Sequence, residues 1–153
     1  MAKTFHFQAT GFYLISKLDE SGVIAYTAAA VTILKGDALH TNGSGAVTNA
    51  TTAFASTFAG IAAEPIASGE VGLVIPPLRK YRFAVPVEED ALITTAAIGT
   101  ICDLQSVNTI DISDVTGAAN ALGFFVDEID VSTAAVAANT YGYAIGHFVA
   151  HTA

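Results

Sequence analysis

Alternation of apolar and polar positions, the period-2 pattern typical of β-strands, dominates the readable parts of this chain. The clearest case is residues 79–87, where one face carries large apolar side chains: Tyr81, Phe83, Val85 and Val87. The opposite face carries Lys80, Arg82, Ala84 and Pro86. This pattern predicts a half-buried strand. Pro86 has no N–H to donate, which favours an edge or a strand end at that point.

Residues 140–151 alternate in the same way, with bulky side chains on one face and mostly small ones on the other. Gly142 and Gly146 lie on the small face. Glycines inside a strand often mark a bend or the close approach of another backbone. A curved barrel strand or a subunit contact accounts for both features.

Shorter apolar runs fill much of the remaining chain, at residues 12–18, 23–34, 54–63, 71–76, 100–104, 109–112 and 122–129. Most are separated by residues that tolerate positive φ or preset a turn, such as Asn42–Gly45 and Ser68–Gly69. Many short strands at this spacing predict an all-β fold, a compact β-barrel or β-tulip-like domain. Helix is signalled only at 90–98 and 132–138, which are too short to organise a fold.

A spacing of 24 residues occurs twice along the chain. Gly36 precedes Gly60 by this distance, and Gly99 precedes Gly123 by the same distance, each glycine being followed by apolar residues. The echo predicts two related β-units within one barrel-type domain that spans residues 21–153. The predicted units are residues 33–76 and 96–138.

Residues 1–20 are predicted to form an N-terminal arm or an edge strand. Between residues 5 and 13 this segment carries four aromatic side chains: Phe5, Phe7, Phe12 and Tyr13. An arm of this kind lies across a neighbouring subunit with its aromatic rings in apolar pockets. These four residues are therefore candidate contact residues.

Composition favours an associating protein. Of the 153 residues, 52% are hydrophobic and 13% are charged, and the mean hydropathy is +0.53. These values exclude disorder, and they predict an apolar surface that serves an oligomer or a lattice. The longest apolar stretch, residues 23–34, falls short of the ~20 residues that a membrane span needs. The N-terminus has no signal-peptide pattern, so we expect synthesis in the cytoplasm and no membrane partner.

Charge is unevenly distributed along the chain. All six Lys and Arg residues precede residue 83, whereas nine of the 14 Asp and Glu residues follow it. This imbalance argues against binding of a nucleic-acid backbone. Arg79, Lys80 and Arg82 form the one basic cluster, and we expect it to pair with an acidic surface on a partner or a sister subunit.

The sequence signals no catalytic, cofactor or metal site. Cys102 is the single cysteine and is expected to be a small buried hydrophobe. His147 and His151 have the i, i+4 spacing of zinc ligands on a helix, but the strand pattern argues against that use. Residues 127–130 are acidic but lack the alternate spacing of a calcium loop, so we expect a solvated rim. Residues 42–45 lack a following Lys-Ser or Lys-Thr and are expected to form a turn.

Four short motifs follow one another between residues 33 and 76: Gly36-Asp37, Gly43-Ser44-Gly45, Ala59-Gly60-Ile61-Ala62 and Ser68-Gly69-Glu70. This succession resembles the small capsid decoration, or cement, proteins of tailed bacteriophages. In the second half the likeness is one of general strand pattern only. The resemblance implies a non-enzymatic virion protein that clusters, commonly as trimers, on the outside of an expanded capsid. There it would bridge subunits of the major capsid protein.

Two other classes of function compete with this interpretation. A head-fibre or host-attachment β-module that binds a carbohydrate is one, because Tyr141 and Tyr143 on one strand face are able to stack on a sugar. A small hydrolase that uses His147 or His151 is the other. Neither class has a motif of its own in the sequence.

Overall fold

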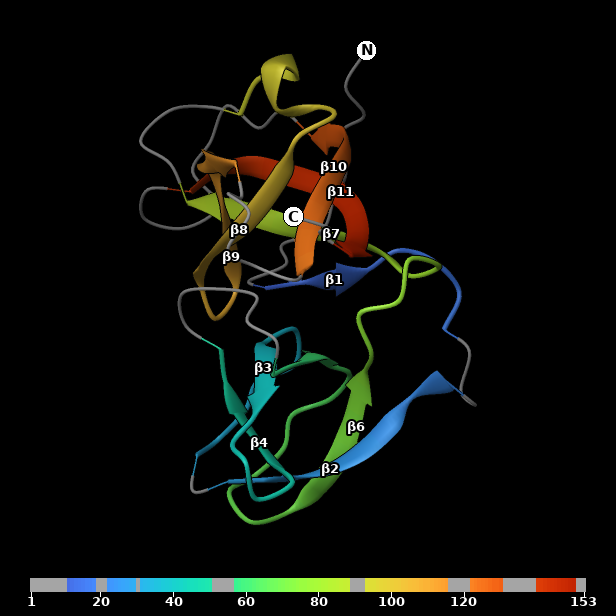
Figure 1. Cartoon of the computed structure of the whole chain (residues 1–153), viewed down its shortest axis with the longest axis vertical. Coiled ribbons are helices and arrows are strands. Elements are labelled where there is room, and N and C mark those ends of the chain that lie inside the picture. Colours follow the sequence, from blue (N-terminus) through green and yellow to red (C-terminus); the bar gives the residue numbers. More distant parts are fainter. Residues whose placement is uncertain are drawn as a thin grey trace.

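Two closed β-barrels, one above the other, make up the fold (Figure 1). The computed structural model describes residues 11–18, 22–29, 31–50, 57–88, 93–115, 122–130 and 140–150. Nearly all regular structure in these ranges is strand, which confirms the all-β barrel prediction. A 3-10 turn, η2, lies at Thr95–Ala97. The helix predicted at 132–138 lies outside the described residues.

The lower barrel in Figure 1 contains five strands: β2 (Ile24–Ala28), β3 (Ala38–Thr41), β4 (Ala46–Asn49), β5 (Phe58–Ala62) and β6 (Val71–Ile75). They pair in the order β2-β4-β3-β5-β6, and β6 pairs with β2 to close the ring. The β2–β4 pair is parallel and the other four pairs are antiparallel. The predicted turn at residues 42–45 is confirmed, since Gly43 and Gly45 have φ near +85° and connect β3 to β4.

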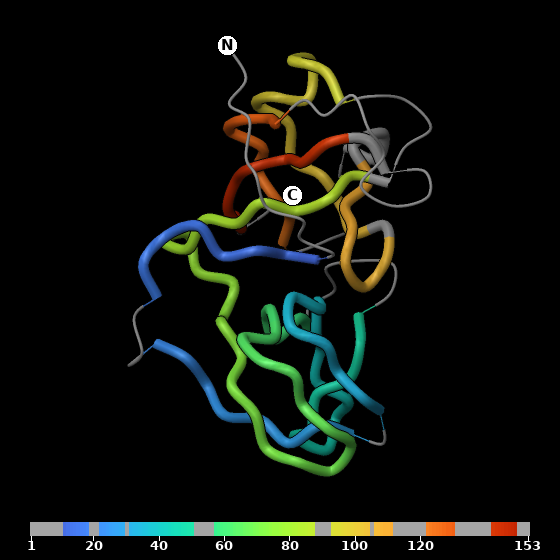
Figure 2. Tube along the Cα trace, turned by 180° about the vertical axis from the view of Figure 1, so that it is seen from behind, coloured from blue at the N-terminus to red at the C-terminus, as the bar shows by residue number. Residues whose placement is uncertain are grey.

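The upper barrel contains the remaining long strands: β7 (Arg82–Glu88), β8 (Ile101–Ser106), β9 (Thr109–Val115), β10 (Leu122–Asp130) and β11 (Thr140–Ala150). They pair in the order β7-β11-β10-β8-β9, and a parallel contact between Val87 and Ile110 joins β9 back to β7. A short strand, β1 (Tyr13–Leu14), adds to the outside of this ring beside β7. Seen from behind, residues 76–81 lead from the lower barrel to the upper one (Figure 2).

The two barrels have the same topology. In each, the first strand pairs parallel with the third and antiparallel with the fifth, and the second strand lies between the third and the fourth. The turn before the second strand is also repeated. Gly36 (φ +90°) donates its N–H to the carbonyl of Ala62 at 2.9 Å, and Gly99 (φ +88°) donates to Val126 at 2.7 Å. Glycine suits both positions because residues with a side chain rarely adopt this left-handed backbone conformation.

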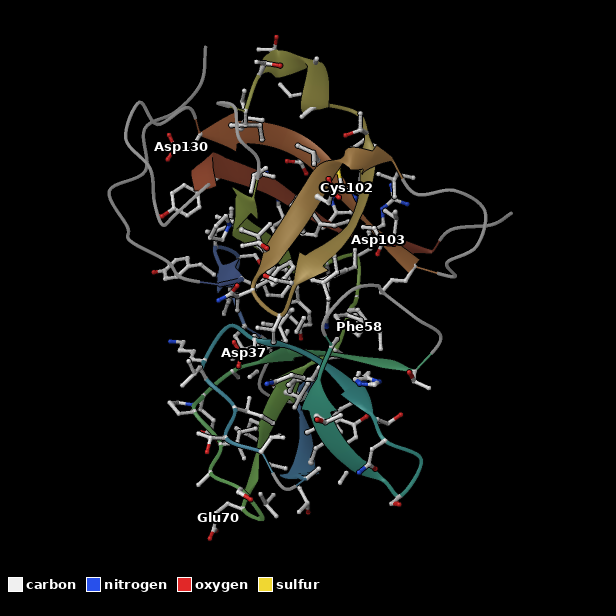
Figure 3. The ribbon with its side chains drawn as sticks, turned by 90° about the vertical axis from the view of Figure 1, so that its left-hand side faces the viewer. Asp37, Phe58, Glu70, Cys102, Asp103 and Asp130 are labelled. Carbon is white, nitrogen blue, oxygen red and sulfur yellow. The ribbon has the colours of Figure 1, made fainter. Side chains whose placement is uncertain are left out.

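The core connects the barrels. One apolar cluster fills the lower barrel: Ala28, Ile33, Leu39, Val47, Ala59, Ala62, Ile66 and Val74. A second cluster fills the upper barrel and also takes in Ala38, Ile61 and Ile75 from the lower one. At its centre, Phe148 has the rings of Phe12, Phe58, Phe83 and Phe124 at centroid distances of 5.3–5.8 Å. Phe58 comes from the lower barrel and lies at the junction in Figure 3.

Strand β7 confirms that a strand lies here, but it begins at Arg82, three residues later than the predicted range 79–87. Two further details differ from the prediction. The apolar face of β7 is buried as expected, but Ala84 on the other face is fully buried too. Tyr13 and Ile145 lie directly opposite Ala84 on the neighbouring strands, and their larger side chains flank it. Pro86 is not at an edge or a strand end. On the side of β7 that faces away from β11, the neighbouring strand changes from β1 to β9 near Pro86. The missing N–H of Pro86 therefore interrupts neither ladder.

Candidate contact surfaces

A group of four charged or titratable side chains lies where β7, β10 and β11 run side by side. Arg82 Nη2 donates to Asp127 Oδ1 at 2.7 Å and to Glu128 Oε1 at 3.3 Å. His147 Nδ1 lies 3.2 Å from Asp127 Oδ2. We call these four residues the Arg82 cluster. It brings together residues that the sequence places in three unrelated segments.

A β-bulge in β10 makes this arrangement possible. Val126 pairs with Gly146 and Glu128 pairs with Ile145, so Asp127 is an extra residue in β10. Successive side chains of a regular strand point to opposite faces of the sheet. A bulge changes that alternation locally. Asp127 and Glu128, although adjacent in sequence, therefore both reach the guanidinium of Arg82.

The electrostatics of the cluster are those of a structural ion-pair network. The hydrogen bond to Asp127 is the main cause that raises the pKa of Arg82, and burial opposes it. The Arg82 and Asp127 side chains are 39% and 27% exposed, so solvent screens the pair and its net contribution is about 1 kcal/mol or less. His147 Nε2 is buried and has no hydrogen-bond partner among the described residues, and the ring of Phe125 lies 5.4 Å from the imidazole.

One residue of the solvated rim expected at 127–130 is buried instead. Asp130 is 3% exposed, so the expectation is wrong for this residue, which pairs opposite Tyr143 at the end of β10. Asp37, in the Gly36-Asp37 motif, is 5% exposed and accepts the N–H of Leu34 at 2.9 Å. Burial raises the pKa of Asp37, and the hydrogen bond from Leu34 partly lowers it again. Figure 3 places Asp37 in the lower barrel near the junction.

An apolar strip lies on the outer face of β2 and β6. Val71 and Leu73 are 65% and 40% exposed, and their cross-strand partners Thr27 and Ala25 are exposed as well. We call these four residues the β2–β6 strip. Ile24, 43% exposed, stands at the beginning of β2 beside it. Exposed apolar groups of this kind mark association surfaces when they are contiguous.

The four aromatic residues predicted to make contacts differ in their burial. Phe5 and Phe7 lie outside the described residues. Phe12 is 4% exposed and belongs to the core, whereas Tyr13 in β1 is 44% exposed. Phe12 directly precedes β1, and neighbouring residues along a strand point to opposite faces, which accounts for its difference from Tyr13.

The three residues of the predicted basic stretch, Arg79, Lys80 and Arg82, also differ in their surroundings. Arg79 and Lys80 are exposed in the turn before β7, and Lys80 Nζ lies 5.2 Å from the centre of the Tyr81 ring. Arg82 finds acidic partners within its own chain. Pairing of Arg79 and Lys80 with an acidic surface on another subunit stays a prediction.

Several other candidates are placed by the structure. Cys102 is a reduced, fully buried thiol, as expected. Tyr143 is only 4% exposed, and the side chain of Tyr141 lies outside the described set. Within the described ranges, no group of three or more His, Cys, Asp or Glu is placed to hold a metal ion. The same ranges contain no helix long and apolar enough to cross a membrane.

The β2–β6 strip is the surface that sequence reasoning missed. Its signal is the alternation of Val71 and Leu73 with the buried Gly72 and Val74, in a run that reads as uniformly apolar. A scan of protein-family models and a search of curated proteins find no match to this chain.

Proposed function

We propose that this chain is a non-enzymatic structural protein that binds the outside of an expanded tailed-phage capsid and bridges subunits of the major capsid protein. The placement of the motifs that carry the resemblance supports the proposal. Gly36-Asp37 leads into β3, residues 43–45 connect β3 to β4, residues 59–62 lie in β5, and Ser68-Gly69 precedes β6. The motifs thus follow one another around a single closed barrel.

The exposed surface suits such a role. Arg79 and Lys80 offer positive charge at the junction of the barrels, and Tyr13 offers an exposed aromatic ring on β1. An aromatic or basic anchor surrounded by weaker contacts is typical of protein interfaces.

Stabilisation of the shell would come from many copies of one modest contact. Each subunit that bridges two capsid subunits adds an interface that must break before the shell ruptures. Because the bound subunits are held at fixed positions, the contacts act together rather than independently.

The test uses capsids that lack this protein, before and after expansion. Co-sedimentation is expected with the expanded form, together with a higher rupture temperature. Arg79→Glu combined with Lys80→Glu should weaken binding. Lys35→Glu is the matched control, because Lys35 is also exposed but lies in the lower barrel before β3. Arg82 is left unchanged because its charge is paired within the chain.

Binding to neither capsid form would remove the proposal. A signal on a glycan array without capsid binding would replace it with the carbohydrate-binding alternative. Equal capsid binding by the double variant and by the wild type would exclude the basic stretch as the contact.

A further inference from the structure

The outer edge of β2 has main-chain groups that none of the described strands pairs with. Ala28 donates its N–H at 2.8 Å to the carbonyl of Glu70, the residue directly before β6. In an antiparallel ladder such bonds involve every second residue, so the main chain of Tyr26 also points toward β6 and that of Ala25 points away. On that far side β4 pairs only with Thr27 and Ala28. In the part of the chain that the structure describes, no strand pairs with Ala25 on this side.

The upper barrel shows what happens at the corresponding edge. There β9 pairs with β7 only at Val87. The rest of that edge is taken by β1, in which Tyr13 lies opposite Ala84. Directly after β1, Ile15 donates its N–H to the carbonyl of Arg82 at 2.9 Å. A strand from outside the ring therefore closes the open half of β7.

The two edges correspond residue by residue. Each barrel has one parallel pair, at Ala28 in β2 and at Val87 in β7. Ala25 precedes Ala28 by the same three residues by which Ala84 precedes Val87. Ala25 therefore corresponds to Ala84, the residue through which β7 pairs with β1, but its main chain faces the open side of β2.

Strand β2 also lacks the features that protect an exposed edge. Natural edge strands carry lysine, proline or a bulge that discourages pairing. Between Gly22 and Ala29 there is no charged residue and no proline, and the pairing of β2 with β6 has no register shift. Ile24, at the open edge, is 43% exposed. Two identical copies of this edge carry no like charges that would repel each other.

We propose that β2 pairs antiparallel with β2 of a second copy of this chain, about a two-fold axis at Ile24. Val23 then lies opposite Ala25 of the partner subunit and exchanges two hydrogen bonds with it, and symmetry doubles that number. The two Ile24 side chains face each other across the axis as a closely spaced pair. The contact joins two lower barrels into one continuous sheet. It needs no capsid, and it is distinct from the trimers that the resemblance implies.

A cross-linking experiment tests the two-fold axis directly. The Ile24→Cys variant, oxidised as the purified full chain, is expected to form a disulfide-linked dimer of twice the 15.7 kDa chain mass. Ile98→Cys is the matched control, because Ile98 is equally exposed but lies in the upper barrel. The native Cys102 is fully buried and does not compete. Cross-linking of Ile24→Cys no faster than that of Ile98→Cys would overturn the proposal.

Sedimentation equilibrium provides the second measurement, by comparing dimerisation of the wild-type chain with that of the Ala25→Pro variant. Ala25→Pro removes the N–H that points to the open side and leaves the hydrogen bonds to β6 in place. Losing one donor in each copy should weaken dimerisation about tenfold to a hundredfold. A melting curve like that of the wild type verifies the fold of the variant. A wild-type monomer at about 100 µM, or an oligomer that Ala25→Pro leaves unchanged, would contradict the inference, whatever the capsid experiment shows.

Discussion

Truncation of Phe148 is expected to destabilise both barrels together. Phe148 is 1% exposed, and four other phenylalanine rings surround it within 5.8 Å. Phe→Ala substitutions in a core typically cost about 3–5 kcal/mol through lost burial and the cavity that remains. Ring pairs add to area burial, so four of them place Phe148→Ala near the top of that range, at about 4–5 kcal/mol.

The assay is urea unfolding followed by circular dichroism, with amide hydrogen exchange of β5 and β10 measured in parallel. With a denaturant slope of about 2 kcal/mol/M, the midpoint should fall by about 2 M. Because Phe58 of β5 contacts Phe148 directly, the amides of β5 should lose protection as much as those of β10. Leu78→Ala is the control. Leu78 is 44% exposed, and its substitution should change stability by about 0.5 kcal/mol or less.

Two outcomes would refute the reasoning. One is a loss of protection in β10 while β5 keeps its own. The other is an unfolding curve of the wild type with two separate transitions. Either result would mean that the shared aromatic core does not couple the two barrels.

Three further predictions concern an ion pair, a buried carboxyl group and a strand glycine. A double-mutant cycle of Arg82→Ala and Asp127→Ala, measured by urea unfolding, should give a coupling free energy of about 0.5–1 kcal/mol that declines at high salt. A coupling free energy of zero would mean that the ion pair does not contribute to stability. Because burial raises the pKa of Asp37, the folded state holds that proton to higher pH than the unfolded chain, so this residue costs stability as pH rises from its ordinary value of 3.8 through its native pKa. Asp37→Asn should remove that loss, which melting temperatures between pH 3 and pH 7 would reveal as a gain at pH 7 only. Gly146→Ala places a methyl group against a backbone carbonyl of β10 and should cost about 1–3 kcal/mol of stability or more. Gly43→Ala is the control: its methyl group meets open space, so the variant should lose only about 1 kcal/mol because of the positive φ. Equal melting temperatures of the two variants would contradict the steric argument.

Strand positions and their faces were predictable because they depend on local periodicity. Tyr81, Phe83 and Val85 alternate with smaller or charged residues, and all three are buried, Tyr81 directly before β7 and the other two within it. The burial of Cys102 was predictable for a similar reason, since an apolar run surrounds it. The glycines of the 24-residue echo were also visible, and Gly36 and Gly99 occupy the same turn in the two barrels.

The Arg82 cluster was not predictable, because it depends on long-range pairing and on one bulge. Arg82 and Asp127 are 45 residues apart in sequence. Nothing in the local pattern indicates that Asp127 is an extra residue in β10 or that Glu128 follows it to the same partner. Phe12 illustrates the same limit. An aromatic residue near a terminus looks available for contact until the strands that bury it are known.

The contiguity of the lower barrel in the sequence has a consequence for the order of folding. All strands of the lower barrel are contiguous in sequence and end at Ile75, so this barrel is complete before β7 is synthesised. Its turn at residues 42–45 can form early, whereas the β2–β6 closure must bring distant segments together and is therefore slow. Until the upper barrel follows, Phe58 and Ile61 at the open end have no partners from β11 or its neighbours. A chain stalled on the ribosome at this stage is expected to be the species most prone to aggregate.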